Sequence, residues 1–326
     1  MGRRDDSGVI APPGRHAVAF AGVLGVALAG AWFGWVGATR LAAGQDFRHT
    51  IATQRAVMAG PALLIAVGVI FLAERRWPAV RRPMLTRAHV VDAGYLALFA
   101  VVVAPLVVLV DTGFAVDAQR HASFLILGRL PVLPRALVVV VVLVAMDLAN
   151  WLAHGASHRF GALWRLHAMH HSQEDMSVFT TFRTHPLVHA SYLPALVPAL
   201  VLGASGPVPT DALVAYACFV ALAHANLPWT FGPLRSVVVS PAYHRLHHAS
   251  SAIDERGTVN FGFVLVCWDQ LAQRALLPSA RFPVPTGIAG RPVPVEQTAG
   301  PFRTLGVMTA QLSQPFERRP SIDGPS

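Results

Sequence analysis

The sequence contains no lysine, so all 26 of its basic side chains are arginines. This absence excludes catalysis through a lysine Schiff base or a lysine nucleophile. Cysteine is also scarce, because the only two, Cys218 and Cys267, are far apart and form no Cys-x-x-Cys motif. The chain therefore lacks the spacing that is typical of a disulfide framework or a thiolate zinc site.

Charged side chains are few as well. They make up 13% of the 326 residues, whereas soluble domains average about 25%. The chain is 54% hydrophobic and its mean hydropathy is +0.49, so we expect part of its surface to face lipid. The net charge is +9, but the arginines are scattered beside apolar segments, which argues against nucleic acid as a partner. Anionic lipid headgroups or an acidic electron donor fit this charge better.

Long uncharged runs predict several membrane spans. A helix needs about 20 apolar residues to cross the hydrocarbon core of a bilayer. The runs of suitable length are Ala17–Thr39, Ala56–Ala73, Ala93–Val110 and Ala136–Ala153, the last interrupted by Asp147. Two shorter apolar runs within residues 190–223 contain three prolines and predict a shallow membrane hairpin. The chain is thus expected to be a polytopic membrane protein.

An arginine-rich loop orients these spans. Residues 74–87, between the second and third runs, contain five arginines, and basic loops are typically cytoplasmic. Counting spans from this loop places the segment from His154 onward in the cytoplasm. We therefore expect an integral protein of a bacterial inner membrane, with its histidine-rich segments on the cytoplasmic face.

Histidine is the residue in which the sequence is rich. Eleven of the 15 histidines fall between His154 and His248. Residues three or four apart share a helical face, so the HxxxH pair and the two HxxHH runs can each direct imidazoles to one place. The runs are His154-Gly-Ala-Ser-His158, His167-Ala-Met-His170-His171 and His244-Arg-Leu-His247-His248. This repetition predicts a metal site, and His224, at the end of an apolar run, is expected to join it.

The number of histidines favours two metal ions over one, because a catalytic zinc takes only three or four protein ligands. An all-imidazole site suits iron or zinc, and redox chemistry on a lipid would require iron. Haem would leave most of the histidines unexplained. His185 and His189 are either further ligands or neighbours of the site. Asp147 is interpreted as a hydrogen-bond acceptor for a ligand imidazole, or else as an interior carboxylate with other partners.

The ordered motifs resemble the fatty acid hydroxylase/sterol desaturase superfamily of membrane di-iron oxygenases. The matching segments lie between Asp147 and Gln270 and include the three histidine runs, Arg183-Thr-His185-Pro186, His224-Ala-Asn226, Asn260-Phe-Gly262 and Trp268-Asp269. The chain departs from the family pattern at the His154–His158 pair, at Val188 and at Gln270-Leu-Ala-Gln273. These departures leave the branch of the family, and hence the substrate, open.

The resemblance implies an all-α fold, a polytopic helical bundle in the membrane with a cytosolic, histidine-rich metal-binding cap. It implies two iron ions and O2 as co-substrate, hydroxylation or desaturation of a lipid, and electrons from ferredoxin or from cytochrome b5 with its reductase. The candidate lipids are fatty acyl, sterol-like, carotenoid or ether lipids. The implied metal ligands are His154, His158, His167, His170, His171, His224, His244, His247 and His248.

The corresponding domain organisation is a basic segment at 1–16, transmembrane helices at 17–146, a fatty acid hydroxylase-like domain at 147–275 that includes the hairpin, and an irregular tail at 276–326. A short amphipathic piece is expected in the tail near Phe302–Leu312. Arg165, Arg183 and Arg245 are candidates for docking a headgroup or the electron donor.

Two other functions remain open at this point. A zinc-dependent membrane hydrolase would need a general base near metal-bound water, for which Glu174 and Glu255 are candidates. A metal transporter or sensor would place ionisable residues along a path within the spans, whereas these histidines gather at one end.

Overall fold

The computed structural model describes residues 61–83, 86–103, 106, 121, 123–125, 133–189, 197–202, 208–250, 259–279, 283–288 and 301–313. The described part is helical and contains no β-strand, only two isolated β-bridges, Val238 with Leu265 and Ala249 with Thr286. Its α-helices are α3 Pro61–Arg76, α4 Arg87–Leu98, α6 Arg135–Arg159, α7 Gly161–His171, α9 Val197–Val201, α10 Val208–Ala223, α11 Pro241–His247, α12 Cys267–Leu271 and α13 Pro301–Ser313. Shorter helical segments are η1 Phe99–Val103, η2 Ser123–Leu125, η4 Val178–Phe182, η5 Pro186–Val188 and η7 Gly232–Ser236.

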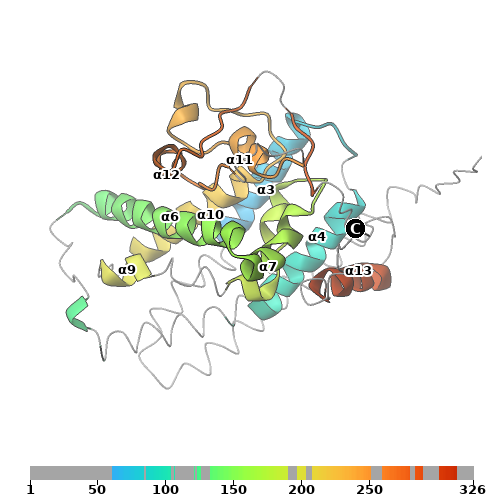
Figure 1. Cartoon of the computed structure of the whole chain (residues 1–326), viewed down its shortest axis with the longest axis horizontal. Helices are drawn as coiled ribbons and strands as arrows, with labels where there is room; N and C mark the ends of the chain where they lie inside the picture. The colour runs from blue at the N-terminus through green and yellow to red at the C-terminus, as the bar shows by residue number, and fades with distance from the viewer. Residues whose placement is uncertain are drawn as a thin grey trace, which may run out of the picture.

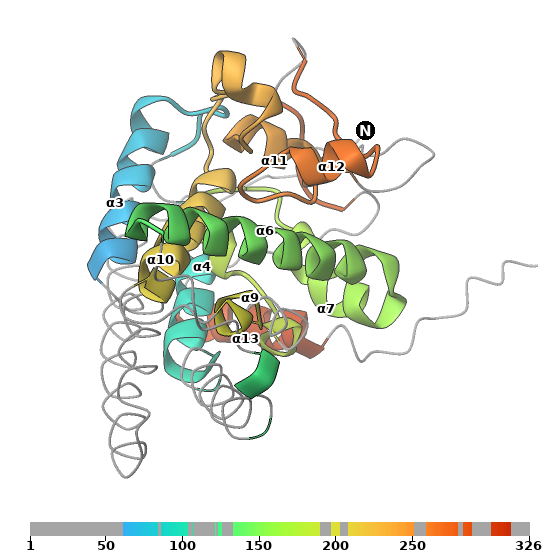
Figure 2. The ribbon, with the colours of Figure 1, turned by 90° about the vertical axis from the view of Figure 1, so that its left-hand side faces the viewer.

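The central helix is α6, which packs against α7 and α10, and α10 packs in turn against α3. In both views α11 and α12 lie on one side of α6, and α13 lies on the other side beside α4 (Figures 1 and 2). Buried side chains of α3, α4, η4 and α10, among them Leu63, Leu96 and Phe179, form one apolar core. A second core joins α6 to α10 through Val142, Met146 and Leu213.

Helix α6 is the one helix in the described part that is long and apolar enough to cross a membrane. It begins with a run of β-branched valines, which have a modest helix propensity in water. In lipid a helix is favoured regardless, because it satisfies every backbone hydrogen bond within the segment. Helix α6 contains the expected span Ala136–Ala153 and continues to Arg159, so it carries His154 and His158 beyond the apolar stretch.

The other expected spans are only partly visible. Ala17–Thr39 lies outside the described residues, and the described parts of Ala56–Ala73 and Ala93–Val110 belong to α3, α4 and η1. Helices α9 and α10 fall within the expected hairpin at 190–223. The all-helical fold therefore agrees with the sequence, while the number of membrane crossings stays a prediction.

Two local breaks in the chain position the histidine helices. Phe160 has extended backbone angles and ends α6, so that α7 starts at Gly161 and folds back against α6. Ser240 caps α11 by accepting a hydrogen bond from the Tyr243 main-chain N–H, and Pro241 occupies the first turn, where proline is well tolerated. These breaks bring α6, α7 and α11 together at one place.

Among the described parts of the segment after residue 276, residues 283–288 and 301–313 are packed, whereas an irregular tail was expected. Helix α13 covers the region of the expected amphipathic piece and packs on α4. The buried Tyr95 hydroxyl donates a hydrogen bond of 2.8 Å to Gln311 Oε1. Residues 283–288 lie against the end of α11, where the Gly287 N–H donates to the His248 carbonyl. These described parts of the tail are therefore packed on the histidine-bearing core.

Candidate metal centre

Nine histidines from four regions of the chain converge inside the protein. They come from α6 (His154, His158), α7 (His167, His170, His171), the residue after α10 (His224), and α11 with its C-cap (His244, His247, His248). Eight of the nine are buried and His158 is half-buried. These are the nine that the family resemblance implied as ligands, and they are the histidines that the structure brings together.

The nine side chains form two adjoining groups. The first comprises His154, His158, His167, His171 and His247, and the second comprises His170, His224, His244 and His248. Within each group the candidate ligand nitrogens all lie within 4.8 Å of one another. The rings of His171 and His248, one from each group, stack at 4.3 Å. Each group is thus compact enough to surround one metal ion, and the two groups are in contact.

The second group contains a pair of nitrogens that cannot hydrogen-bond to each other. His224 Nδ1 lies 2.8 Å from the Val220 carbonyl oxygen, and His170 Nδ1 lies 3.3 Å from the Arg183 carbonyl oxygen. Because a carbonyl oxygen only accepts, both Nδ1 atoms must be the protonated donors. In the neutral rings both Nε2 atoms then carry lone pairs, and they face each other at 3.0 Å. A shared cation removes this repulsion.

The first group is oriented in the same way. His154 Nδ1 lies 2.9 Å from the Phe261 carbonyl oxygen, and His247 Nδ1 lies 2.7 Å from the Val259 carbonyl oxygen. Their Nε2 lone pairs therefore point into the group. Carbonyl acceptors of this kind fix the tautomer and the ring orientation of metal-binding histidines. Four of the nine imidazoles are thus fixed with Nε2 directed inward.

The spacing of the nitrogens limits the coordination geometry. Neighbouring Nε2 atoms stand 3.0–3.1 Å apart, for example His154 with His167 and His224 with His244. Two nitrogens about 2.1 Å from one metal are about 3.0 Å apart at an angle of 90° and about 3.4 Å apart at the tetrahedral angle. Nitrogens this close together can bind the same metal ion within each group.

Several buried nitrogens have no hydrogen-bond partner in the described structure. They are His158 Nε2, His167 Nδ1, His244 Nδ1 and both ring nitrogens of His248. Native proteins rarely leave buried polar atoms unsatisfied. Metal coordination would satisfy the Nε2 atoms of His158 and His248, so the residues present fit a two-metal centre.

Burial keeps these imidazoles neutral, which is the form that binds metals. Desolvation is the largest cause, and it lowers the pKa of His224 from 6.5 to about 4. The pKa values of His170 and His248 are lowered well below 6.5, first by desolvation and then by neighbouring histidines. The centre therefore presents neutral ligands throughout the physiological pH range.

Two phenylalanines shield the first group. The Phe263 ring stacks on His154 at 4.8 Å, and the Phe261 ring lies 5.1 Å from His158. Both phenylalanines are buried, and the Phe261 carbonyl is the acceptor that orients His154. The loop that carries Phe261 and Phe263 therefore excludes water from the first group and fixes the orientation of His154.

Asp147 does not accept a hydrogen bond from a ligand imidazole, so that interpretation was wrong. Its carboxylate accepts hydrogen bonds from the main-chain N–H groups of Val264 and Leu265 and from Trp268 Nε1, at 3.0, 3.0 and 2.8 Å. Asp147 thus ties α6 to the loop that carries Phe261 and Phe263. Asp147 therefore affects the histidines indirectly, by holding that loop in position.

The sequence did not reveal the role of Asp269, although the Trp268-Asp269 pair was part of the family resemblance. Its buried carboxylate accepts from Trp151 Nε1, the Tyr243 hydroxyl and the main-chain N–H groups of Phe261 and Gly262, at 2.8–3.0 Å. These donors belong to α6, to α11 and to the loop. Asp269 therefore connects three of the segments that carry or orient the histidines.

Two of the three arginines proposed to dock a headgroup or a donor are internal. Arg183 is fully buried and pairs with the buried Asp92 at 3.3 Å. Arg245 is 2% exposed, and its Nε donates to the Val284 carbonyl. Burial, followed by the charge of Arg82, lowers the pKa of Arg245 to about 10, so it remains protonated. Arg165 is exposed.

His185 and His189 lie outside both histidine groups. His185 Nδ1 accepts from the Leu187 N–H, and its Nε2 lies 3.3 Å from the Leu312 carbonyl of α13. His189 Nε2 lies 3.0 Å from the Thr184 hydroxyl. His185 thus contacts η5 and α13, and His189 contacts the residue Thr184 just before η5.

Comparison with known proteins agrees with this site. The model of the fatty acid hydroxylase family matches residues 139–273. The ornithine lipid hydroxylase OlsE of Rhizobium tropici is 34% identical over 188 residues, which are 57% of this chain and 52% of that protein. No solved structure gives a significant match.

Two alkylglycerol monooxygenases are more distant. The Caenorhabditis elegans protein is 29% identical over 132 residues, and the human protein is 26% identical over 133 residues. The matched regions cover 38% and 39% of this chain and 24% and 28% of those proteins. The chain thus spans about half the length, or less, of the curated relatives it matches. Residues 139–273, which match the model of the fatty acid hydroxylase family, contain all nine converging histidines.

Proposed function

We propose that this protein is an integral membrane di-iron oxygenase that uses O2 to oxidise a lipid. The observation that carries the proposal is the pair of lone pairs that face each other at 3.0 Å between His170 and His224. The nine imidazole ligands suit iron or zinc, and oxidation of a lipid requires a redox-active metal, so we assign iron. When bound, the two irons would supply O2 activation and redox chemistry.

The chain itself supplies the metal ligands, excludes water from the centre and offers the lipid an apolar surface. All nine histidines act as ligands, in the two groups described above. Phe261 and Phe263 exclude water from the first group. The exposed Leu148 and Leu152 on α6 give the substrate chain an apolar surface near the centre. The polytopic arrangement and the cytoplasmic placement of the centre, argued from the basic loop at 74–87, complete this proposal.

The relatives favour hydroxylation over desaturation, because they are a hydroxylase and monooxygenases. The electrons would come from a ferredoxin, or from cytochrome b5 with its reductase, at the cytoplasmic face. Of the two candidate bases for a hydrolase, Glu174 belongs to neither histidine group, and Glu255 lies outside the described residues. Asp147, the ionisable residue within the expected span Ala136–Ala153, is fixed by three hydrogen bonds, which does not favour a transport path.

The first test compares His170→Ala with His121→Ala, whose histidine lies outside both groups. The purified full chain is loaded with Fe(II) anaerobically, and bound iron is measured by mass spectrometry. We expect the His170 variant to lose at least half of its iron and all O2-dependent lipid oxidation, and the His121 variant to retain both. Full activity and iron content in the His170 variant would contradict the proposal.

Lipid profiling of a deletion strain identifies the reaction. A hydroxylase leaves behind a lipid about 16 mass units lighter than its product, and a desaturase leaves one about two units heavier. Activity that persists without O2 would instead indicate a hydrolase.

A further inference from the structure

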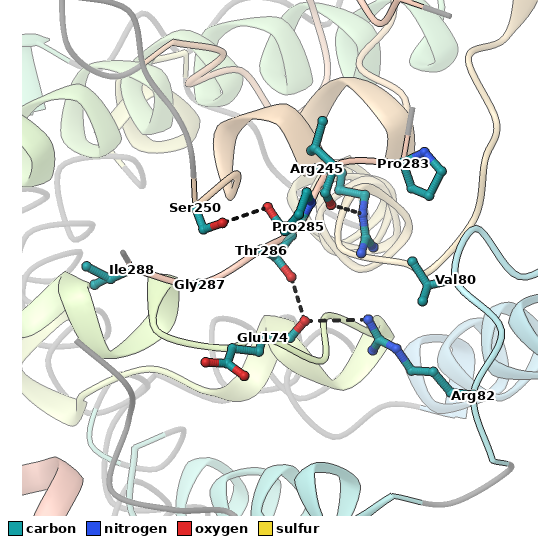
Figure 3. Close-up of a pocket in the computed structure, with 11 residues that line it drawn as sticks. Val80, Arg82, Glu174, Arg245, Ser250, Pro283, Pro285, Thr286, Gly287 and Ile288 are labelled. Atoms are coloured by element: carbon teal, nitrogen blue, oxygen red, sulfur yellow. Dashed lines mark hydrogen bonds between the residues drawn. The ribbon is translucent and has the colours of Figure 1, made fainter. Parts of the chain in front are cut away.

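A cavity of about 600 Å³ lies outside the two histidine groups (Figure 3). Its walls come from the loop after α3, the turn after α7, the end of α11 and residues 283–288. The polar side chains around it are Arg82, Glu174, Arg245, Ser250 and Thr286. Neither the metal centre nor its ligands uses this space.

Arg245 is a buried cation that lacks a matching anion. Its Nε donates to the Val284 carbonyl at 3.2 Å, and its Nη1 lies 3.5 Å from Asn226 Oδ1. Within the described part of the chain, no carboxylate lies within ion-pair distance of its guanidinium. Burying a charge without a counter-charge is costly. An anion in the cavity would relieve this cost.

Arg82 adds a second positive charge to the same cavity. Its Nε pairs with Asp175 at 3.2 Å, and its other nitrogens donate to the carbonyls of Glu174 and Met176. The carboxylate of Glu174 does not neutralise Arg82 or Arg245, because Figure 3 shows it turned away from both guanidinium groups. Asp175 offsets the charge of Arg82, so Arg245 is the cation at this cavity whose guanidinium has no carboxylate within ion-pair distance in the described part of the chain.

We propose that this cavity binds an oxyanion, a phosphate or carboxylate group, between Arg245 and Arg82. Guanidinium groups match the planar, paired oxygens of these anions. The volume accommodates a lipid headgroup as well as a free anion. Arg245 lies between His244 and His247 on α11, so the occupied cavity steadies the helix that supplies ligands to both histidine groups.

The test measures binding of inorganic phosphate to the purified full chain in maltoside detergent at constant ionic strength, by calorimetry. We expect saturable binding to the wild type. Arg245→Gln should bind about tenfold more weakly or worse, because it removes the charged hydrogen-bond donor. Glu174→Gln should bind more tightly, because it removes a negative charge from the cavity wall. Arg235→Gln, at an exposed arginine of η7 outside the cavity, should leave binding unchanged.

Ser250→Asp provides a variant that keeps the arginines in place. Ser250 lines the cavity, and its hydroxyl donates only a long hydrogen bond of 3.4 Å to the Pro285 carbonyl. The added carboxylate should occupy the site and abolish phosphate binding, whereas Ser279→Asp, at an exposed serine outside the cavity, should not. Absence of saturable binding to the wild type, or equal binding to the Arg245→Gln and Ser250→Asp variants, overturns the proposal.

Adding phosphatidylglycerol to the micelles distinguishes the sources of the anion. If a lipid headgroup fills the cavity, phosphatidylglycerol competes with phosphate in the wild type. If phosphate binding is unaffected, the site serves a soluble anion. Both results support an oxyanion site, and neither depends on the iron content or activity of the protein.

Discussion

Main-chain carbonyls, rather than carboxylates, orient the histidines of this centre. Phe261, Val259, Val220 and Arg183 each present a carbonyl oxygen to the Nδ1 of one imidazole. A carbonyl has no charge that varies with pH, so the tautomers of these four histidines do not depend on the titration of a neighbour. The protonation of the imidazoles themselves then controls metal retention.

The metal-free protein should lose stability as the pH falls from about 6.5 towards 4. Burial lowers the pKa of His224 from 6.5 to about 4, whereas the unfolded chain takes up this proton near 6.5. The unfolded state thus binds more protons within this window, so lowering the pH favours unfolding. Each such histidine contributes at most about 1.4 kcal/mol per pH unit.

Thermal unfolding of the metal-free chain in detergent at pH 7.5, 6.5 and 5.5 checks this expectation. The midpoint should fall between pH 7.5 and 6.5 and should fall more steeply between pH 6.5 and 5.5. A midpoint that is constant down to pH 5 would show that the histidines are not held neutral.

Asp269→Asn should destabilise the protein and reduce its bound metal. The carboxylate accepts from four donors, and the amide nitrogen of asparagine would oppose some of them. Leaving a buried donor without a partner costs about 1–3 kcal/mol. Because the loop that orients His154 would shift, metal content should fall as well.

Asp211→Asn is the matched control for this substitution. Asp211 forms an exposed ion pair with Arg135, and such pairs contribute about 1 kcal/mol or less. The two variants are compared by thermal unfolding and by metal analysis. Equal stability and metal content in both would contradict the role of Asp269.

At the scale of elements, the loop from Asn260 to Val266 links α6, α11 and α12. Asp147 and Asp269 hold it through main-chain N–H groups, and Gly262 allows its close approach. A Cβ atom at Gly262 would lie 2.7 Å from the Leu265 carbonyl oxygen and 3.2 Å from Asp269 Oδ2. The loop must therefore move if any side chain is added there.

Gly262→Ala should lower the free energy of unfolding by about 1–3 kcal/mol, as is usual for overpacking in a well-packed interior. Gly155→Ala is its control, since a Cβ there meets only Phe261 at 3.9 Å, and alanine favours the helix by about 1 kcal/mol. Chemical denaturation in detergent measures both. A Gly262 variant as stable as the Gly155 variant would show that the loop is not tightly held.

Local sequence patterns predicted the helices whose formation depends on the spacing of neighbouring residues. The apolar run with HxxxH at its end gave α6, and the HxxHH spacing gave the shared helical faces of α7 and α11. The contacts of Asp147, Arg183 and Arg245 were not predictable in this way. The partners of Asp147 are 117–121 residues away in sequence, and Asp92 is 91 residues from Arg183. Spacing alone does not distinguish an arginine that faces solvent from one that is buried.

At the scale of the whole molecule, the proposed orientation in the membrane rests on the basic loop at 74–87. Arg81 in this loop is exposed. In a background with Cys218 and Cys267 replaced by serine, Arg81→Cys should react with a membrane-impermeant maleimide only when the cytoplasmic side is accessible. Labelling is compared in intact cells and in inverted membrane vesicles.

Labelling of this cysteine in intact cells would reverse the orientation and place the histidines on the opposite face. The sequence predicted the orientation from charge, but the number of crossings depends on apolar segments of which only α6 meets the length requirement in the described part. Length and composition alone do not decide whether a short apolar helix such as α10 spans a bilayer.

The two histidine groups are interleaved along the chain. Neighbouring residues His170 and His171 belong to different groups, and so do His247 and His248. A metal in one group therefore restricts the backbone of α7 and α11, on which the other group also depends. The conformational entropy of these helices is lost when the first metal binds and is not lost again with the second. Loading should consequently be cooperative, so that partly loaded molecules are rare and the protein exists mainly with both metals or with none.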